Sequence, residues 1–501
     1  MTIPDPEALS SAYEPEFSAK RSGAFFTPES VSQSLVHWAC RSPSERMLDP
    51  SCGDGEFLRH HWNSVGIEQN PVSAHQAMDR APGALVHEGD FFAWAADTSE
   101  RFECAAGNPP FIRYQTFKGP VRQRALALCS DLGAHFSGLS SSWAPFLVAT
   151  ASLLKPGGRM AFVVPAEIGH APYAAPLLHY LTQNFERVQV IAVREKLFPH
   201  LSEDCWLLFA EGFSGQTDSI RFTVCDRFEP SQEPPSADTS VLVSEWEQTW
   251  QNRLRSLILP DTIREIYRMA ADDSGSHRLG DFARIGIGYV SGDNRFFHLT
   301  PAEAKRWGIP DRLLLPSVRK SRSLPTGSIT RSDVEAWKAD DAPCLLLRLP
   351  REGRVPVSVA NYLESASGMA ARKGYKCRTR SPWYAVPDVR IPDYVMTYMS
   401  GRSVKLVRND AGVTCTNSLH AVNLTNKTMA KACLARWSSP FTQLSCEIEG
   451  HALGGGMLKL EPREARRVLF PPRVLLAQLK IEDIEASTRL LQSWRHYADR
   501  P

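Results

Sequence analysis

Short apolar runs alternate with helix-like segments through the first half of the chain. Runs such as Met160–Pro165 and Trp206–Ala210 are strand-length and strongly apolar, as in strands buried on both faces of a sheet. We expect strands at Arg46–Pro50, Ser64–Glu68, Ala84–His87, Glu103–Ala106, Met160–Pro165, Val188–Val193 and Trp206–Ala210, and helices at Gly55–Asn63, Pro71–Arg80, Trp143–Leu154 and Pro176–Phe185. This βαβα order predicts a mostly parallel sheet covered by helices on both faces.

The pattern changes in the second half of the chain. Residues 228–240 are rich in Pro and Ser, which is typical of a loop or linker, and a charged helical stretch follows to about Met269. From Leu279 onward the sequence is less regular, with Gly, Pro and Arg among aromatic residues. A chain of 501 residues suits two domains, which we place at residues 1–245 and 246–501, the second of mixed α+β structure.

Composition excludes several classes of protein. With 43% hydrophobic and 22% charged residues the chain can bury a sizeable core, and no apolar run approaches the roughly 20 residues of a membrane helix. The first residues lack the basic and apolar regions of an export signal, so we expect a cytoplasmic protein with no membrane contact. The 11 cysteines form no CxxC pair or Cys/His cluster, and we expect no metal site.

Charge is unevenly distributed although the net charge is only +2. Residues 281–420 carry 22 Lys and Arg against 13 Asp and Glu, a surplus of +9, so the remainder of the chain sums to −7. A basic region beside an acidic one suggests contact with a polyanion, and a solvated charged surface would explain the counts equally well.

Candidate ligand-binding residues follow the first three predicted strands. The loop Asp49-Pro50-Ser51-Cys52-Gly53-Asp54-Gly55 links the first strand to a predicted helix, where open α/β sheets bind ligands. Glu68 ends the second strand, where a carboxylate can accept hydrogen bonds from both ribose hydroxyls. Asp90 follows the third strand and could accept from an adenine amino group, while Phe91 offers an apolar face to the ring. Singly, each could be a turn or an exposed strand end.

The fourth strand leads into Gly107-Asn108-Pro109-Pro110-Phe111. Two prolines fix the chain and remove two N–H donors, which leaves carbonyl oxygens and the Asn108 side chain as acceptors. An exocyclic amine is a poor nucleophile because its lone pair is conjugated with the ring. The Asn108 Oδ1 atom and the Pro109 carbonyl could hold both of its N–H groups and direct the lone pair at a methyl donor, with Phe111 stacked on the base.

These motifs, in this order, resemble the gamma class of N6-adenine DNA methyltransferases, the TaqI-like and Eco57I-like enzymes. The resemblance covers nearly the whole chain, and it implies a Rossmann-like class I S-adenosylmethionine-dependent methyltransferase domain followed by a target-recognition domain. Gly23-Ala24-Phe25-Phe26-Thr27-Pro28 looks like the family's N-terminal cofactor motif. The implied cofactor-binding residues are Phe26, Thr27, Pro28, Asp49, Ser51, Gly53, Gly55, Glu68, Asp90, Phe91 and Asn108.

The implied catalytic residues are Asn108, Pro109, Pro110, Phe111 and Phe198. Phe198, in Leu197-Phe198-Pro199, corresponds to a later aromatic motif that packs on the extruded adenine. Phe111 departs from the family, because Tyr is commoner at that position; stacking needs only the ring. An opening Asn rather than Ser favours adenine N6 over cytosine N4 as the target.

The C-terminal half resembles the target-recognition domain of the Eco57I-like members. The segments at 284–294, 378–384 and 454–460 look like its landmarks. The physical pattern agrees, because a basic cluster lies beside Tyr375, Trp383 and Tyr384, and such side chains can neutralise phosphates or read guanine edges. The candidate DNA-binding residues are Lys373, Lys376, Arg378 and Arg380.

We therefore expect a site-specific enzyme that transfers a methyl group from S-adenosylmethionine to a flipped-out adenine in double-stranded DNA. It would be a monomer on DNA and the modification enzyme of a type II-like restriction-modification system, with a separately encoded endonuclease. The alternatives are an orphan regulatory or phage-defence adenine methyltransferase, an RNA or protein-glutamine methyltransferase, and a silent DNA-binding subunit. A bifunctional restriction enzyme is not expected, because about twenty residues before Gly23 are too few for a nuclease domain.

Overall fold

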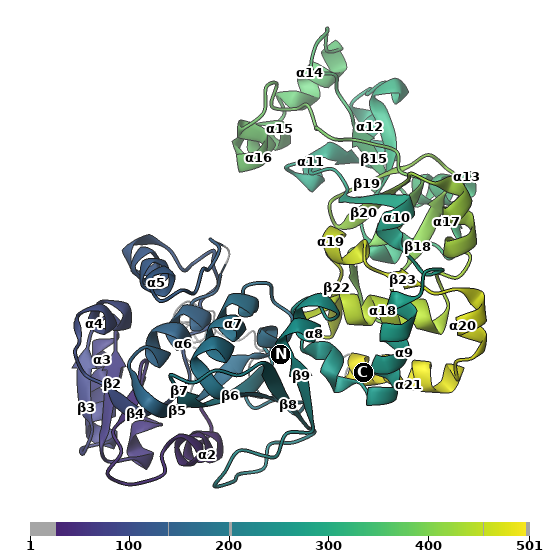
Figure 1. The fold of residues 1–501 in the computed structure, drawn as a ribbon. Coiled ribbons are helices and arrows are strands. Elements are labelled where there is room, and N and C mark those ends of the chain that lie inside the picture. The colour runs from purple at the N-terminus through teal and green to yellow at the C-terminus, as the bar shows by residue number, and fades with distance from the viewer. Residues whose placement is uncertain (1–26, 139, 200–202, 454, 497–501) are drawn as a thin grey trace, which may run out of the picture. The chain divides into compact units, whose positions relative to one another are not determined.

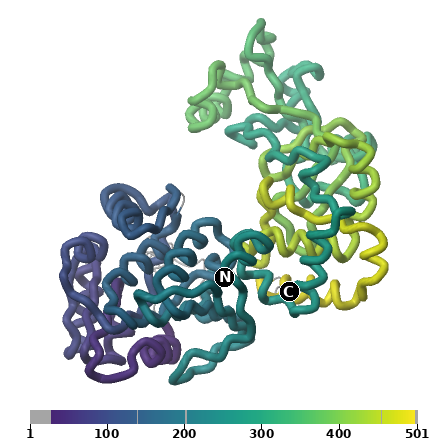
Figure 2. Tube along the Cα trace, in the orientation of Figure 1, coloured from purple at the N-terminus to yellow at the C-terminus, as the bar shows by residue number. Residues whose placement is uncertain are grey.

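The computed structural model describes residues 27–138, 140–199, 203–453 and 455–496. The chain divides into two compact units, Met1–Ile258 and Leu259–Pro501, where the sequence suggested a boundary at residue 245. Figure 2 follows the chain through both, from the purple and blue first unit to the green and yellow second. Within the described residues, no helix combines the length and apolarity needed to cross a membrane.

The first unit is a nine-stranded sheet covered by helices. The strand order is β3-β2-β1-β4-β5-β7-β6-β8-β9. Its strands are β1 (Met47–Asp49), β2 (Ser64–Glu68), β3 (Leu85–Glu88), β4 (Phe102–Gly107), β5 (Leu154–Pro165), β6 (Phe185–Val193), β7 (Cys205–Phe213), β8 (Ser219–Cys225) and β9 (Thr239–Leu242). Its α-helices are α2 (Glu29–Ala39), α3 (Pro71–Arg80), α4 (Phe91–Asp97), α5 (Gly119–Asp131), α6 (Trp143–Ala151), α7 (Ala174–Asn184) and α8 (Val243–Gln248), with short 3₁₀ helices η1 (Leu58–His60), η2 (Ala166–Gly169) and η3 (Arg255–Ile258).

Neighbouring strands from β3 to β5 are parallel, and β7 runs antiparallel between β5 and β6. Helix α2 packs on β4 and β5, while α6 and α7 pack on β5, β6 and β7 from the other face (Figure 1). Apolar residues of β5 and β7 are buried along nearly their whole length, which explains their unbroken apolar sequence. The mostly parallel sheet with helices on both faces, predicted from the strand and helix order, is confirmed.

Two local predictions were wrong. The segment Gly55–Asn63 forms turns and the single 3₁₀ turn η1 instead of an α-helix. Gly53 and Gly55 there adopt positive φ angles of 55° and 87°, which do not continue into a right-handed helix. Strand β5 begins at Leu154, well before the predicted Met160, because Leu154 pairs with Phe102 of β4 and extends the strand through Lys-Pro-Gly-Gly. That pairing is long-range and leaves no local signal.

The second unit is α+β with several small sheets. Their strand orders are β10-β23, β11-β20-β16-β18-β14, β12-β15-β13-β19 and β17-β22-β21. The strands are β10 (His277–Arg278), β11 (Ala283–Ile287), β12 (His298–Leu299), β13 (Leu314–Val318), β14 (Ser328–Ile329), β15 (Leu345–Leu347), β16 (Tyr394–Thr397), β17 (Met399–Ser400), β18 (Leu406–Asn409), β19 (Thr414–Cys415), β20 (Leu419–Leu424), β21 (His451–Leu453), β22 (Met457–Lys459) and β23 (Leu469–Phe470).

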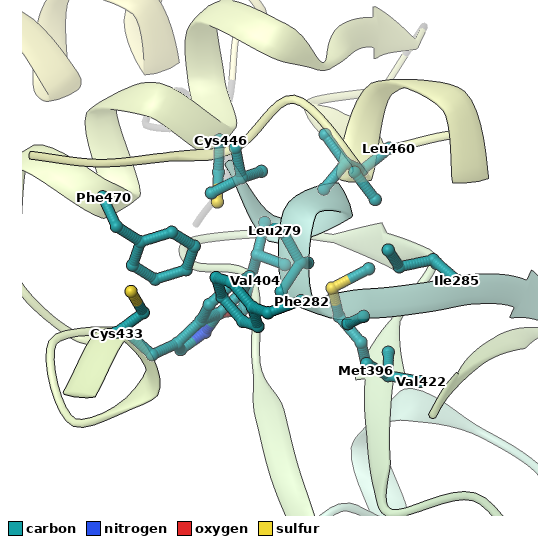
Figure 3. Close-up of a cluster of buried hydrophobic side chains, with 14 of the residues drawn as sticks. Leu279, Phe282, Ile285, Met396, Val404, Val422, Cys433, Cys446, Leu460 and Phe470 are labelled. Carbon is teal, nitrogen blue, oxygen red and sulfur yellow. The ribbon is translucent and has the colours of Figure 1, made fainter. Parts of the chain in front are cut away.

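Its α-helices range in length from 4 to 13 residues. They are α9 (Asp261–Asp272), α10 (Leu279–Phe282), α11 (Asn294–Phe297), α12 (Pro301–Arg306), α13 (Arg331–Ala339), α14 (Val357–Leu363), α15 (Ala366–Lys373), α16 (Tyr375–Arg378), α17 (Lys427–Leu434), α18 (Pro440–Glu449), α19 (Pro462–Ala465), α20 (Arg473–Ala477) and α21 (Ile481–Ser493), with 3₁₀ helices η4 (Asp311–Leu313) and η5 (Ser321–Ser323). The core of this unit lies in separate apolar clusters. In the cluster of Figure 3 the rings of Phe282 and Phe470 lie 5.6 Å apart between centroids.

Two networks of buried polar groups in the second unit are paired within the protein. The Arg495 side chain, just after α21, forms a fully buried ion pair of 2.7 Å with Glu447 on α18 and also donates to the carbonyl of Gly401. The Tyr289 hydroxyl lies 2.6 Å from both His298 Nε2 and Ser317 Oγ. These networks hold together segments that are far apart in the sequence.

Candidate active site

Four strand ends bring the predicted site residues to one edge of the first unit's sheet. Strand β1 lies between β2 and β4, and all three run parallel, so their carboxyl ends meet. Asp49 ends β1, Glu68 ends β2 and Asn108 directly follows β4. Asp90 lies just beyond the end of β3, at the start of α4. The sheet thus gathers residues that are separated by up to 59 positions in the sequence.

The two glycines of the loop after β1 serve different purposes. A Cβ atom built on Gly53 would meet no atom within 4 Å, so this backbone borders open space that a ligand can approach. A Cβ atom on Gly55 would lie 2.9 Å from the Cα of Ala77, because helix α3 packs directly against the loop. Gly53 therefore suits a ligand, while Gly55 is required by the packing of the protein itself.

Asp49 is buried, and one of its oxygens has no partner. Its Oδ1 atom accepts a hydrogen bond from the Ser51 N–H at 3.1 Å, and its Oδ2 atom contacts no donor. Burial raises the pKa of the Asp49 carboxyl to about 8; the Ser51 N–H opposes this rise, and the nearby charge of Glu68 adds to it. A buried acceptor without a donor is costly unless a ligand supplies one.

Glu68 is held in place by two backbone N–H groups. Its Oε2 atom accepts from Gly53 at 3.0 Å, and its Oε1 atom accepts from Asn70 at 2.6 Å. Each carboxylate oxygen can accept a second hydrogen bond, so the side chain retains capacity for a ligand hydroxyl. The bond to Gly53 also ties the end of β2 to the loop after β1.

Asp90 has two partners within the protein. Its Oδ1 atom caps helix α4 by accepting from Phe92 N at 3.2 Å, and its Oδ2 atom accepts from Arg124 Nε at 3.1 Å and Nη2 at 2.5 Å. Arg124 belongs to α5, which packs on α4 and α6 (Figure 1). The neighbouring Phe91 is buried and stacks on Phe146 at 5.2 Å between centroids, so one face of its ring is already covered.

The loop after β4 holds the Asn108 amide in one orientation. Asn108 Nδ2 donates to the hydroxyl of Thr27 at 3.2 Å, while Asn108 Oδ1 is buried and has no hydrogen-bond partner. The Ser51 hydroxyl donates to the Asn108 carbonyl at 3.3 Å. The Pro110 carbonyl accepts from the buried Ser142 hydroxyl, which also accepts from Ile112 N at 3.0 Å. No hydrogen bond is given to the Pro109 carbonyl by the residues that the structure describes.

The remaining predicted residues of this site are placed as follows. Phe111 and Phe198 are both buried, with exposures of 8% and 6%. Pro28 is the N-cap of helix α2, and its carbonyl accepts from Val31 N at 2.9 Å. Phe26 lies outside the described residues.

Arg124 and Ser142 were missed by the sequence analysis. Arg124 left no signal, since it faces Asp90 from a helix that was not predicted. Ser142 ends a run of three serines before the predicted helix at Trp143, which marked the position as a helix start but not as a contact of the loop after β4.

The predicted DNA-binding residues of the second unit fall into two groups. Lys373, Lys376 and Arg378 are exposed on α15 and α16, and no acidic partner lies within ion-pair distance among the described residues. Arg380 instead donates to the carbonyls of Ser291 and Val290 at 2.5 and 2.6 Å. Part of the basic cluster lines a shallow cavity of about 440 Å³ formed by Arg372, Arg378, Arg380, Ser381, Pro382 and Trp383.

The aromatic residues beside this cluster are also divided. Trp383 packs against Phe296 in the core of the unit, with ring centroids 5.6 Å apart, and Tyr384 packs on Trp383. Tyr375 is 67% exposed, and the Lys376 ammonium lies 5.8 Å from its ring centroid. Of the three aromatics, Tyr375 is therefore the one most available to a partner.

Comparisons with known proteins agree across both units. Residues 251–499 match the family model described as the C-terminal domain of type II methyltransferase M.Eco57I, and residues 7–78 match that of the N-6 DNA methylases. The chain is 18% identical to type II methyltransferase M.AccI of Acinetobacter calcoaceticus, over 95% of this chain and 89% of the relative. It is 23% identical to M.XamI of Xanthomonas campestris pv. amaranthicola, over 90% and 86%. A solved chain from the DrdV–DNA complex has a TM-score of 0.48 and 11% identity, covering 96% of this chain and 58% of its own.

Proposed function

We propose that the loop after β4 holds the target amine and that the preceding strand ends hold the cofactor. The chain belongs to the Eco57I type of N6-adenine DNA methyltransferases. The enzyme transfers a methyl group from S-adenosylmethionine to adenine N6 in DNA, as the modification activity of a type II restriction-modification system. The observation that carries the assignment of the site is Asn108. Its amide nitrogen is engaged by Thr27, and its oxygen is buried without a partner.

The residues at the sheet edge fit S-adenosylmethionine. Asp49 Oδ2 is a buried acceptor without a donor, Gly53 borders open space, and Glu68 retains acceptor capacity. These features suit a ligand that brings several N–H and O–H donors. We assign Glu68 to the ribose hydroxyls and Asp90 to the adenine amino group, with Gly53 against the ligand and Asp49 as a shared acceptor behind it.

The cofactor supplies a methyl group on a sulfonium centre, and the protein prepares the amine that receives it. Asn108 Oδ1 and the Pro109 carbonyl accept the two N–H groups of the adenine amine. These bonds draw the nitrogen toward tetrahedral geometry and aim its lone pair. Phe111 and Phe198 hold the base between them by stacking. Because a paired base cannot reach this edge, the adenine must leave the duplex first.

The two units divide the work in this proposal. Residues 1–245 carry the cofactor and the chemistry, and residues 246–501 bind and read the target DNA through Lys373, Lys376 and Arg378. Arg380 supports the segment that carries them, since its guanidinium is bound to the carbonyls of Val290 and Ser291. The enzyme acts as a monomer in the cytoplasm. It protects the DNA of its own cell from a separately encoded endonuclease.

Replacing Asn108 tests the chemistry. Asn108→Ala should abolish methyl transfer while S-adenosylmethionine and DNA still bind, because the side chain acts mainly on the transition state. Phe111→Ala should be milder, since stacking contributes about 1–3 kcal/mol per base. An adenine opposite a mismatch is easier to extrude, so it should partly rescue Phe111→Ala but not Asn108→Ala.

The assay follows tritiated methyl incorporation into matched and mismatched duplexes, and mass spectrometry identifies the modified base. An Asn108→Ala variant with near wild-type turnover would overturn the proposed mechanism.

Replacing the exposed lysines tests the second unit. Lys373→Ala with Lys376→Ala should weaken DNA binding and reduce the slope of log affinity against log salt by about 0.9 for each phosphate that is no longer neutralised. Lys338→Ala is the matched control, because Lys338 is already paired with Glu335 at 2.8 Å and should not alter the slope. Fluorescence anisotropy at several salt concentrations measures it. An unchanged slope in the double variant would place the DNA-binding surface elsewhere.

A further inference from the structure

The side chain of Asn108 has two ends that differ in chemistry but hardly in shape. Only the oxygen can accept a hydrogen bond from the target amine; the NH₂ group would confront it with further donors. A terminal amide rotates between two nearly equivalent orientations, so something in the protein must select one. Thr27 holds one of them: its hydroxyl accepts from Nδ2 at 3.2 Å, and Oδ1 has no partner among the described residues.

Thr27 is suited to this task by its position. It is 7% exposed and precedes Pro28, the N-cap of helix α2, which packs on β4, the strand that leads to Asn108. The helix therefore fixes the distance between two residues that are 81 positions apart. A rigid support of this kind retains its orientation when the substrate enters.

Ser142 controls the other end of the loop. Its hydroxyl donates to the Pro110 carbonyl and accepts from Ile112 N at 3.0 Å, and its own N–H donates to the Ile112 carbonyl at 3.0 Å. Ser142 is fully buried at the start of α6. Two of these bonds engage the carbonyls of residues 110 and 112, whereas no hydrogen bond from a described residue reaches the Pro109 carbonyl.

We propose that Thr27 and Ser142 are positioning residues for methyl transfer. Thr27 turns the Asn108 amide so that its oxygen faces the amine, and Ser142 withdraws the Pro110 carbonyl, so that Asn108 Oδ1 and the Pro109 carbonyl form the acceptor pair. This proposal rests on the proposed role of Asn108. It gives Thr27 a role toward the catalytic side chain that differs from the cofactor contact expected from the sequence.

Two substitutions of Thr27 separate these roles. Thr27→Val keeps the volume and removes the hydroxyl, and it should slow single-turnover methyl transfer by about three- to tenfold at saturating S-adenosylmethionine and DNA. Calorimetry should show unchanged affinity for S-adenosylmethionine. Thr27→Ser, which retains the hydroxyl, should recover most of the rate. Thr182→Val, which removes a buried hydroxyl bonded only within α7, is the matched control and should keep the wild-type rate.

Ser142→Ala gives an independent measurement. It should slow transfer at saturating substrates and leave the affinity for S-adenosylmethionine unchanged, and the calorimetric titration itself reports that the unit is folded. A weaker cofactor affinity with a wild-type saturated rate in Thr27→Val would overturn the positioning role in favour of a cofactor contact. Full rate in both variants, with Asn108→Ala inactive, would overturn this proposal alone; an active Asn108→Ala would overturn the proposed function beneath it.

Discussion

Two sets of buried polar groups, one at the sheet edge of the first unit and one in the core of the second, differ in whether they are paired. At the sheet edge of the first unit, Asn108 Oδ1 and Asp49 Oδ2 are buried with no donor. In the second unit, Arg495 and Glu447 are buried as a pair, and Tyr289 bridges His298 and Ser317. An unmatched buried acceptor costs free energy, whereas a matched network joins distant segments. At the sheet edge the unmatched atoms suit a ligand that brings donors, whereas the matched groups in the second unit stabilise the fold.

The same contrast extends to proton affinity. Burial raises the pKa of Asp49 to about 8, so the free protein keeps this carboxyl protonated near neutrality. Burial, with Arg319 nearby, lowers the pKa of His298 to about 4, so that imidazole stays neutral. Burial disfavours the charged form of both groups; His298 already has protein partners, whereas Asp49 faces a site where a ligand can supply one.

The largest effect should come from breaking a matched network. Glu447→Gln leaves the Arg495 guanidinium buried without its counter-charge, and it should lower the free energy of unfolding of the second unit by about 3–5 kcal/mol. Urea denaturation measures the loss. The control is Glu335→Gln in the exposed Lys338–Glu335 pair, which should cost at most about 1 kcal/mol. Equal losses in the two variants would contradict the importance of the buried pair.

Replacing the unmatched Asp49 carboxyl should instead raise the free energy of unfolding near neutral pH. The folded-state pKa of Asp49 lies above its unfolded value of 3.8, so its contribution to stability is complete below about pH 4 and is lost as the pH rises toward 8. The slope is about 1.4 kcal/mol per pH unit. Asp49→Asn should remove this slope and make the free protein more stable than wild type at pH 7.

Urea denaturation at pH 5, 6 and 7 measures both curves in the absence of cofactor. The same variant should bind S-adenosylmethionine more weakly. Parallel pH dependence in the two proteins would show that Asp49 is ionised when folded, and the contrast between the units would then fail.

The smallest of these effects concerns a group that is partly matched. Glu68 already accepts two backbone N–H bonds, so Glu68→Ala should lose only its bonds to the ligand and weaken S-adenosylmethionine binding by about ten- to hundredfold, or 1.5–3 kcal/mol. Calorimetry measures the affinity. Glu186→Ala removes an exposed carboxylate at the amino end of β6, on the opposite edge of the sheet, and should not change it. Unchanged affinity in Glu68→Ala would remove Glu68 from the site.

Sequence patterns located the strand ends because local signals define them. Strand β2 and helix α3 were predicted with their correct bounds, and Asn70 and Pro71 supply the cap and first turn that begin α3. Contacts between distant segments were not predictable. The Thr27–Asn108 and Arg124–Asp90 pairs, and the use of Arg380 to hold two carbonyls, depend on tertiary packing that one sequence does not display.

Motif spacing also did not show which glycine serves which purpose. Gly53 and Gly55 belong to the same Gly-rich loop, but Gly55 is required by Ala77 on the following helix, whereas Gly53 borders open space. The distinction depends on where helix α3 packs against the loop. Within this one motif, Gly53 is suited to a ligand and Gly55 is required by the packing of the fold.

The Arg124–Asp90 ion pair has a kinetic consequence. With Asp90 assigned to the adenine amino group, Arg124 competes for the same carboxylate oxygen whenever the nucleoside leaves. The methyl donor and its demethylated product carry the same adenine, so the pair must open before either can bind; it slows the binding of both by the same factor and cannot discriminate between them. With this assignment, helix α5 slows the entry of cofactor, while the choice between the two nucleosides is left to the end that carries the methyl group.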